Sequence, residues 1–211
     1  MYLEQEPIRN DALKIVAVAV MIIDHIGAIF FPSEDLFRII GRIAFPIFSY
    51  YLVQGAIYTS NIKKYAVRLF LFGLLSQIPF TLLFDTYTLN IMFVLLLSLL
   101  LIRGGWMYVG VVGVLTFLIP MDYDFYGVLI APILYWLRDK KALALLVLAA
   151  ITIFYCFYNM NWLQIYAIPG FIFVLFARRK TLNKRVNKYF FYWFYPAHMI
   201  VLLIVKYLFN Y

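Results

Sequence analysis

Two polar residues stand side by side inside the first long apolar segment of this 211-residue chain. The segment reads MIIDHIGAIFFP from Met21 to Pro32, and its polar pair is Asp24 and His25. A neutral imidazole can accept a proton from a hydroxyl or an amine, and a neighbouring carboxylate can stabilise the resulting imidazolium. The pair therefore points to proton transfer, with structural pairing inside the protein as the alternative.

The composition indicates the medium in which these residues lie. Hydrophobic residues make up 66% of the chain and charged residues 13%, whereas soluble domains are about half apolar and about a quarter charged. We therefore predict an all-α integral membrane protein. Its length favours a single domain over residues 1–211, folded as one polytopic helical bundle.

Nine apolar segments are candidates for transmembrane helices, because a full span needs about 20 residues. They are residues 12–31, 36–58, 64–84, 89–103, 105–119, 125–138, 141–158, 161–177 and 190–209. The fourth, fifth and sixth are short, so two of them are candidates for half-spanning or re-entrant helices.

Charges alternate between the loops that join these segments. Basic residues fill the second, fourth, sixth and eighth loops, the last reading RRKTLNKRVNK from Arg178 to Lys188, and acidic residues mark the first, third and fifth. Lys and Arg mark the cytoplasmic side of short loops, so we predict a multi-pass cell-membrane protein with a cytoplasmic N-terminus and an outside C-terminus. The net charge of +8 is then explained by topology and by contact with anionic lipid of the bilayer or with a phosphate-bearing cytosolic ligand, and nucleic acid is not an expected partner.

Further charged residues lie at the depth of the first pair. Asp24 precedes Pro32 by eight positions and Arg42 follows Asp35 by seven, which places both about 10–12 Å below the outer surface on consecutive helices. An unpaired charge inside a membrane is costly, so we expect Asp24 to pair with Arg42 while His25 points elsewhere. Arg38, one turn from Arg42, would extend outward or add to a basic patch.

Three other segments bring polar side chains to the same part of the bundle. They contribute Gln77, Asn90 and His198, the last just after the helix-kinking Pro196. Such a histidine can act as a base or simply form a hydrogen bond between helices, and both interpretations remain open. The few possible metal ligands show no ligand spacing, so we expect no metal.

These segments together resemble the TraX family. The resemblance rests on LKIVAVAVMIIDHIGAIFFP, FRIIGRIAFPIFSYYLVQG, KKYAVRLFLFGLLSQIPF, the segment at Asn90, YGVL and FYWFYPAHMIVLLI, and it covers nearly the whole chain. The family is named for a conjugative-plasmid protein needed to N-acetylate pilin. It is similar to a wider group of transmembrane acyltransferases, in which cytosolic acyl-CoA donates to an acceptor reached from the other side.

The resemblance implies an acyltransferase that uses acyl-CoA, such as acetyl-CoA, as co-substrate and an extracytoplasmic or lipid-linked amine or hydroxyl as acceptor. It implies His25 as the catalytic base and Asp24 as its neighbour. The substrate-binding residues that it implies are Arg38, Arg42, Gln77, Asn90, Tyr195 and His198. Two other functions stay open, namely a small-molecule or proton-coupled transporter with Asp24, His25 and Arg42 as its relay, and a non-catalytic membrane scaffold.

Overall fold

The computed structural model describes residues 11–176 and 189–209, and these form a bundle of helices without a β-strand. The helices are α1 (Asp11–Phe30), α2 (Asp35–Gly41), α3 (Ala44–Tyr58), α4 (Ile62–Phe84), α5 (Ile91–Gly104), α6 (Val109–Leu118), α7 (Asp124–Trp136), α8 (Lys141–Asn159), α9 (Ala167–Phe176) and α10 (Phe190–Leu208), with the 3₁₀ helices η1 (Trp106–Tyr108) and η2 (Trp162–Tyr166). The predicted all-α membrane bundle is confirmed, and each of the nine predicted segments contains one helix or two consecutive ones.

The nine segments differ in length. Five are long and apolar enough to cross a membrane: Ala12–Phe30, Asp35–Tyr58, Ile62–Phe84, Lys141–Asn159 and Phe190–Leu208. The shorter apolar segments are Ile91–Gly104, Trp106–Leu118, Asp124–Trp136 and Trp162–Phe176. The fourth to sixth segments are thus short, as predicted, and the eighth is short as well. The basic eighth loop lies outside the described residues, and the side on which each terminus lies stays a prediction.

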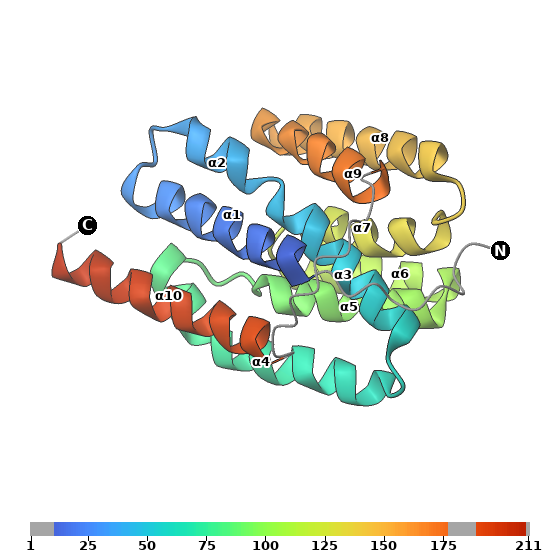
Figure 1. Cartoon of the computed structure of the whole chain (residues 1–211), viewed down its shortest axis with the longest axis horizontal. Helices are drawn as coiled ribbons and strands as arrows, with labels where there is room; N and C mark the ends of the chain where they lie inside the picture. The colour runs from blue at the N-terminus through green and yellow to red at the C-terminus, as the bar shows by residue number, and fades with distance from the viewer. Residues whose placement is uncertain (1–10, 177–188, 210–211) are drawn as a thin grey trace.

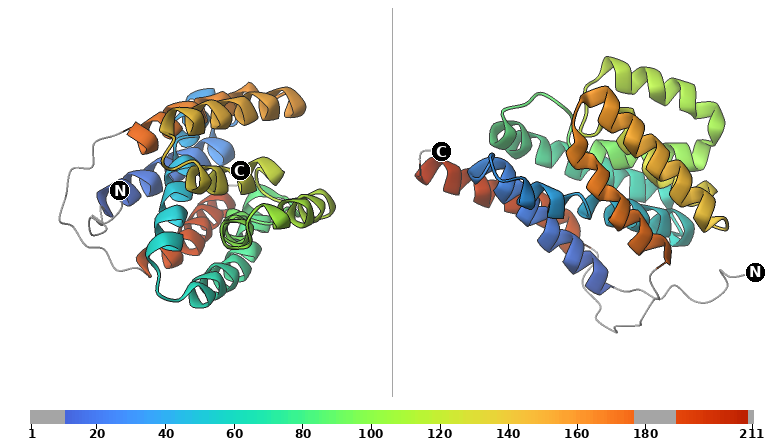
Figure 2. Two further views of the ribbon diagram at one scale, coloured as in Figure 1. Left: turned by 90° about the vertical axis from the view of Figure 1, so that its right-hand side faces the viewer. Right: turned by 90° about the horizontal axis from the view of Figure 1, so that it is seen from above.

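The helices pack around α3 and α5 in the middle of the bundle. Helix α3 contacts α1, α5, α7 and α9, while α10 packs along α4 and touches α1. Figure 1 shows α1 and α10 running in the same direction, with the α1–α2 turn and the end of α10 at one end of the molecule. Figure 2 shows α8 and α9 covering the bundle on the side away from α4. The two histidine-bearing helices are therefore neighbours although they lie at opposite ends of the chain.

Two glycines allow α1 and α2 to approach closely. A Cβ atom added at Gly27 would collide with Phe37, and one added at Gly41 would collide with the carboxylate side chain of Asp24. Only glycine leaves room for the facing side chain at such a close crossing. The α1–α2 hairpin therefore holds Asp24 directly against the backbone of α2.

The segment predicted as one helix over 36–58 is broken at Arg42. Helix α2 ends at Gly41 and α3 begins at Ala44. Pro46, in the first turn of α3, has no N–H to donate to the carbonyl of Arg42, and its ring would clash with that carbonyl in a continuous helix. The break thus puts Arg42 at a helix end, with its side chain turned into the bundle.

The loop before α7 is held beside the start of α5. The Leu89 amide donates to the Pro120 carbonyl at 2.9 Å, and the Asp122 amide donates to the Leu89 carbonyl at 2.8 Å. Tyr123 and Asp124 follow with positive φ angles of 61° and 48°, a conformation that is strained for a bulky residue such as tyrosine. The strained turn directs the Tyr123 side chain toward α2 and α3.

Candidate active site

Asp24 and His25 point to different helices although they are adjacent in sequence. The Asp24 carboxylate faces α2, and the His25 ring faces α10. Neighbouring positions on a helix point about 100° apart, so the two side chains can serve separate partners. The polar site accordingly has two halves, an arginine half and a histidine half, joined by one peptide bond.

Asp24 is paired with two arginines. Arg38 Nη1 donates to Asp24 Oδ2 at 2.8 Å and to the Asp24 carbonyl oxygen at 3.1 Å, while Arg42 Nη2 lies 3.9 Å from Asp24 Oδ1. The predicted Asp24–Arg42 pair is therefore present, but the tighter partner is Arg38, which binds inward instead of extending outward. Asp24 and Arg42 are each only 8% exposed, and the pairing offsets part of the cost of burying their charges.

Arg42 is the centre of a wider hydrogen-bond network. Its Nη1 donates to the Tyr123 hydroxyl at 3.0 Å and to Gln164 Oε1 at 3.1 Å. The Gln164 amide donates in turn to the Tyr126 hydroxyl at 3.3 Å, which lies 3.1 Å from Thr152 Oγ1. The network thus connects the α2–α3 break with α7, η2 and α8.

Tyr123 and Gln164 are partners that the sequence analysis missed. Gln164 is an amide inside the apolar segment over 161–177 and is 3% exposed, so its need for a buried partner was a usable signal. Tyr123 gave no such signal, because it lies between two aspartates in what reads as a surface loop.

The two histidines form the other half of the site. His25 Nδ1 lies 2.9 Å from His198 Nε2, and the two rings are nearly parallel, at 15° to each other, with centroids 5.0 Å apart. His198 Nδ1 lies 2.9 Å from the Phe194 carbonyl oxygen. The structure therefore brings together, from α1 and α10, the two histidines of the sequence.

The carbonyl contact assigns the protons of a neutral pair. A carbonyl oxygen only accepts hydrogen bonds, so His198 Nδ1 must carry the proton. The Nε2 atom of neutral His198 is then an acceptor, and His25 Nδ1–H is its donor. His25 Nε2 is left with a lone pair, and no described residue hydrogen-bonds to it. In this arrangement His25 Nε2 is the basic atom of the site.

Gln77 and Asn90 lie together but serve the backbone. Asn90 Nδ2 donates to the Gly73 carbonyl at 2.8 Å and to Gln77 Oε1 at 2.9 Å, and its Oδ1 accepts from the Met92 amide at the start of α5. Gln77 Nε2 donates to the Thr88 carbonyl at 2.8 Å. Within the described residues neither side chain hydrogen-bonds to Asp24 or His25, so their geometry is that of a helix cap between α4 and α5.

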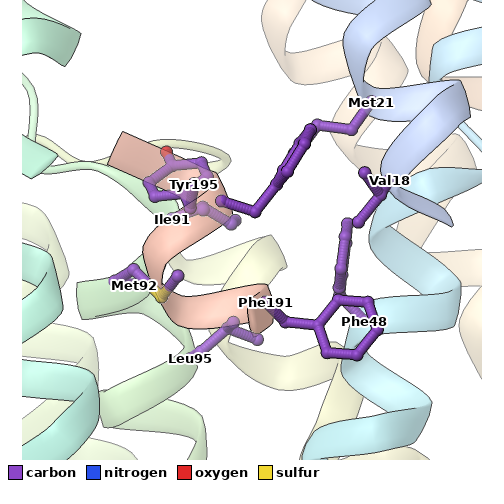
Figure 3. A pocket seen from close by; sticks show the side chains of 9 residues that line it. Val18, Met21, Phe48, Ile91, Met92, Leu95, Phe191 and Tyr195 are labelled. Atoms are coloured by element: carbon purple, nitrogen blue, oxygen red, sulfur yellow. The ribbon is translucent and has the colours of Figure 1, made fainter. Parts of the chain in front are cut away.

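An apolar pocket lies beside the histidines, and Tyr195 lines it. Its walls come from α1, α3, α5 and α10: Val18, Met21, Phe48, Ile91, Met92, Leu95, Phe191, Phe194 and Tyr195. Figure 3 shows these side chains around the space. The volume is about 40 Å³, enough for about three water molecules. The Phe194 ring also stacks on His198 with ring centroids 5.3 Å apart. The same ring therefore borders both the pocket and the histidine pair.

Asp122 adds a titratable group next to the arginine half. Burial raises the pKa of this carboxyl, in the loop before α7, to about 7, although the guanidinium of Arg42 opposes the shift. Its charge therefore changes near neutral pH beside the buried Asp24 and Arg42.

Residues 11–176 and 189–209 contain no group of three histidine, cysteine or acidic side chains that could hold a metal ion.

Comparison with known proteins shows the family to which the chain belongs. A family described as TraX protein matches residues 9–206, which span both halves of the site. The chain belongs to the TraX family. This TraX-family chain is 29% identical to a probable fimbrial assembly protein FimC, serogroup H1, of Dichelobacter nodosus, over 92% of its own length and 94% of that protein. It is 26% identical to Protein TraX of Escherichia coli, over 95% of its own length and 88% of that protein. No solved structure matches it.

Proposed function

We propose that the protein is a membrane-embedded acyltransferase that moves an acetyl or similar acyl group from cytosolic acyl-CoA to an amine or hydroxyl acceptor reached from outside. The observation that carries the proposal is the His25–His198 pair, because it leaves one imidazole nitrogen unprotonated and orients the ring that bears it. A base positioned by a second group in this way is the usual arrangement for activating a nucleophile. Membership of the TraX family supports the same proposal.

The chemical step needs one proton acceptor and later one proton donor. In the direct route, His25 Nε2 takes the proton of the acceptor N–H or O–H while the acceptor atom attacks the thioester carbonyl carbon. The C–S bond then breaks, and the leaving thiolate takes the proton from His25, which yields free CoA and the acylated acceptor. Transfer through an acyl-histidine would use the same atom as nucleophile.

Asp24 contributes to this step through its charge. Its carboxylate is held by Arg38 at 2.8 Å and not by His25, so it does not orient the imidazole directly. Arg38 and Arg42 would disfavour the imidazolium that forms when His25 takes a proton, and the Asp24 carboxylate offsets their positive charge. The two arginines in turn set the position of the carboxylate.

The test is acyl transfer by purified protein with acetyl-CoA and a set of amine and hydroxyl acceptors. His25→Ala should lower transfer by about 10²–10⁴-fold, the usual loss for a general base, while acetyl-CoA binding and folding are retained. Near wild-type transfer by His25→Ala would overturn the proposal. Movement of an acceptor across the membrane without acylation would favour the transporter instead, and the absence of both activities would leave the scaffold.

A further inference from the structure

One face of α1 leads from the start of the helix to the candidate base. Lys14, Val18, Met21 and His25 are spaced by four, three and four positions, the spacing that places side chains on one side of a helix. The distance along the axis from Lys14 to His25 is about 16 Å for eleven residues. The face thus begins with a cation, continues with two apolar side chains and ends at an imidazole.

The facing side of α10 also leads through aromatic side chains to a histidine. Phe191, Phe194, Tyr195 and His198 lie at helical spacing, and the first three line the apolar pocket together with Val18 and Met21. Helices α1 and α10 contact each other and run in the same direction (Figure 1). We call this strip between the two helices, from Lys14 to the histidine pair, the α1–α10 seam.

Aromatic rings hold a cation at the start of the seam. Lys14 Nζ lies 4.7 Å from the ring centroid of Tyr51 and 5.2 Å from that of Phe191. Phe191 also lines the pocket, so the lysine and the apolar space share a wall. The start of the seam therefore carries the positive charge of Lys14, and cation–π contacts hold this side chain in place.

We propose that the α1–α10 seam is the binding site of the acyl donor, with Lys14 contacting a phosphate of CoA and the small apolar pocket taking the short part of the arm next to the thioester. This assignment rests on the proposed function. Acyl-CoA carries its phosphates at one end, an uncharged chain in the middle and the thioester at the other end. The seam presents a cation, apolar walls and a base in that order, and charge-assisted contacts to phosphate are among the stronger ones.

The phosphate selectivity of the seam is tested by equilibrium binding in bilayer nanodiscs with two probes. Acetyl-CoA has phosphates, and S-acetyl-N-acetylcysteamine has the thioester and a short piece of the arm without them. Lys14→Gln should weaken acetyl-CoA binding about tenfold, the loss expected for one charge-assisted contact, and leave the cysteamine thioester unchanged. Lys141→Gln is the matched control, since it removes the same charge at the start of α8 and should change neither affinity.

The apolar part of the seam is tested by filling it. Val18→Phe adds volume to the pocket and should abolish the binding of both probes. If that variant does not fold, Val18→Cys in a Cys156→Ala background replaces it, and acetyl-CoA should slow its modification by a maleimide. Unchanged binding in Val18→Phe, or no protection of Val18→Cys, would overturn the assignment.

The outcomes separate this assignment from the proposed function. If the Lys14 and Val18 variants weaken acetyl-CoA binding but the wild type acylates no acceptor, the assignment of the seam as a CoA site is supported and the proposed function fails. If acyl transfer occurs while Lys14→Gln and Val18→Phe bind both probes normally, the seam is wrong and the function stands. The assignment of the seam would also be overturned if the wild-type protein bound no acyl-CoA. Binding of only phosphatidylglycerol from the nanodisc at Lys14 would overturn it as well.

Discussion

His198 fixes which nitrogen of His25 can accept a proton. The Phe194 carbonyl holds the proton of His198 on Nδ1, and His198 Nε2 then holds the proton of His25 on Nδ1. This chain of two contacts determines a tautomer in the way that a buried carboxylate does in other histidine-based sites. His198 therefore acts through His25 as a positioning residue.

We expect His198→Phe to keep the ring stack but to lose the acceptor for His25 Nδ1–H. Acyl transfer should fall by about 10- to 150-fold, the equivalent of about 1.5–3 kcal/mol for a hydrogen bond to a group that becomes charged. The pH profile of the remaining activity should also shift, because His25 would lose the group that sets its tautomer. A purely structural role of His198 would leave the profile unchanged. Loss of activity with an unchanged profile would indicate damage to packing and not to the tautomer.

Asp122 predicts a pH dependence of stability. Burial raises its pKa from 3.8, the ordinary value of the carboxyl, to about 7, so the folded protein keeps a proton that the unfolded chain loses between about pH 4 and 7. Its contribution to stability is therefore present at low pH and is lost as the pH rises through that window. Thermal unfolding in detergent should show the wild type losing stability relative to Asp122→Asn from pH 4 to 7, and a constant difference would contradict this.

At the scale of helices, the α1–α2 crossing sets the position of Asp24. Gly41→Ala would drive a methyl group into the Asp24 side chain, so we expect a loss of about 1–3 kcal/mol, as for other overpacked sites. Acyl transfer should fall with it, because the carboxylate must move. The measurement is thermal unfolding together with the transfer assay.

Gly110→Ala is the matched control for that substitution. Gly110 lies in α6, and a Cβ atom added there meets nothing within 4 Å. Alanine should be neutral or stabilise the helix by about 0.5–1 kcal/mol. Equal effects of the two substitutions would show that the α1–α2 crossing is not tight.

Hydropathy and loop charge were enough to predict the helices but only one of the contacts in the site. The apolar segments predicted the helices, and the equal depths of Asp24 and Arg42 predicted that these two side chains would meet. Pro46 was a sequence signal for the helix break at Arg42. The direction in which the Arg42 side chain then points depends on tertiary packing. Tyr123 reaches Arg42 because of the strained loop before α7, a tertiary arrangement that no local pattern encodes.

At the scale of the whole molecule, the orientation in the membrane is the main prediction still to be checked. The alternation of basic and acidic loops predicts that Ser33 faces outside and Ser60 faces the cytoplasm. Single cysteines at these positions, in a Cys156→Ala background, should react with a membrane-impermeant maleimide from opposite sides of intact cells and inverted vesicles. Labelling of both from the same side would refute the topology.

The short segment η1–α6 has a consequence for the lipid around the protein. Trp106–Leu118 covers 13 residues, about 20 Å at the helical rise, whereas the hydrocarbon core is about 30 Å thick. Val111, Val114 and Phe117 are 58%, 59% and 87% exposed, so no helix among the described residues covers this flank and we expect it to face lipid. A hydrophobic mismatch of this kind is relieved by local thinning of the bilayer. We therefore expect the membrane to be thinner on the flank of α6 than beside the long α4 and α10, and water to approach the interior of the bundle more closely there.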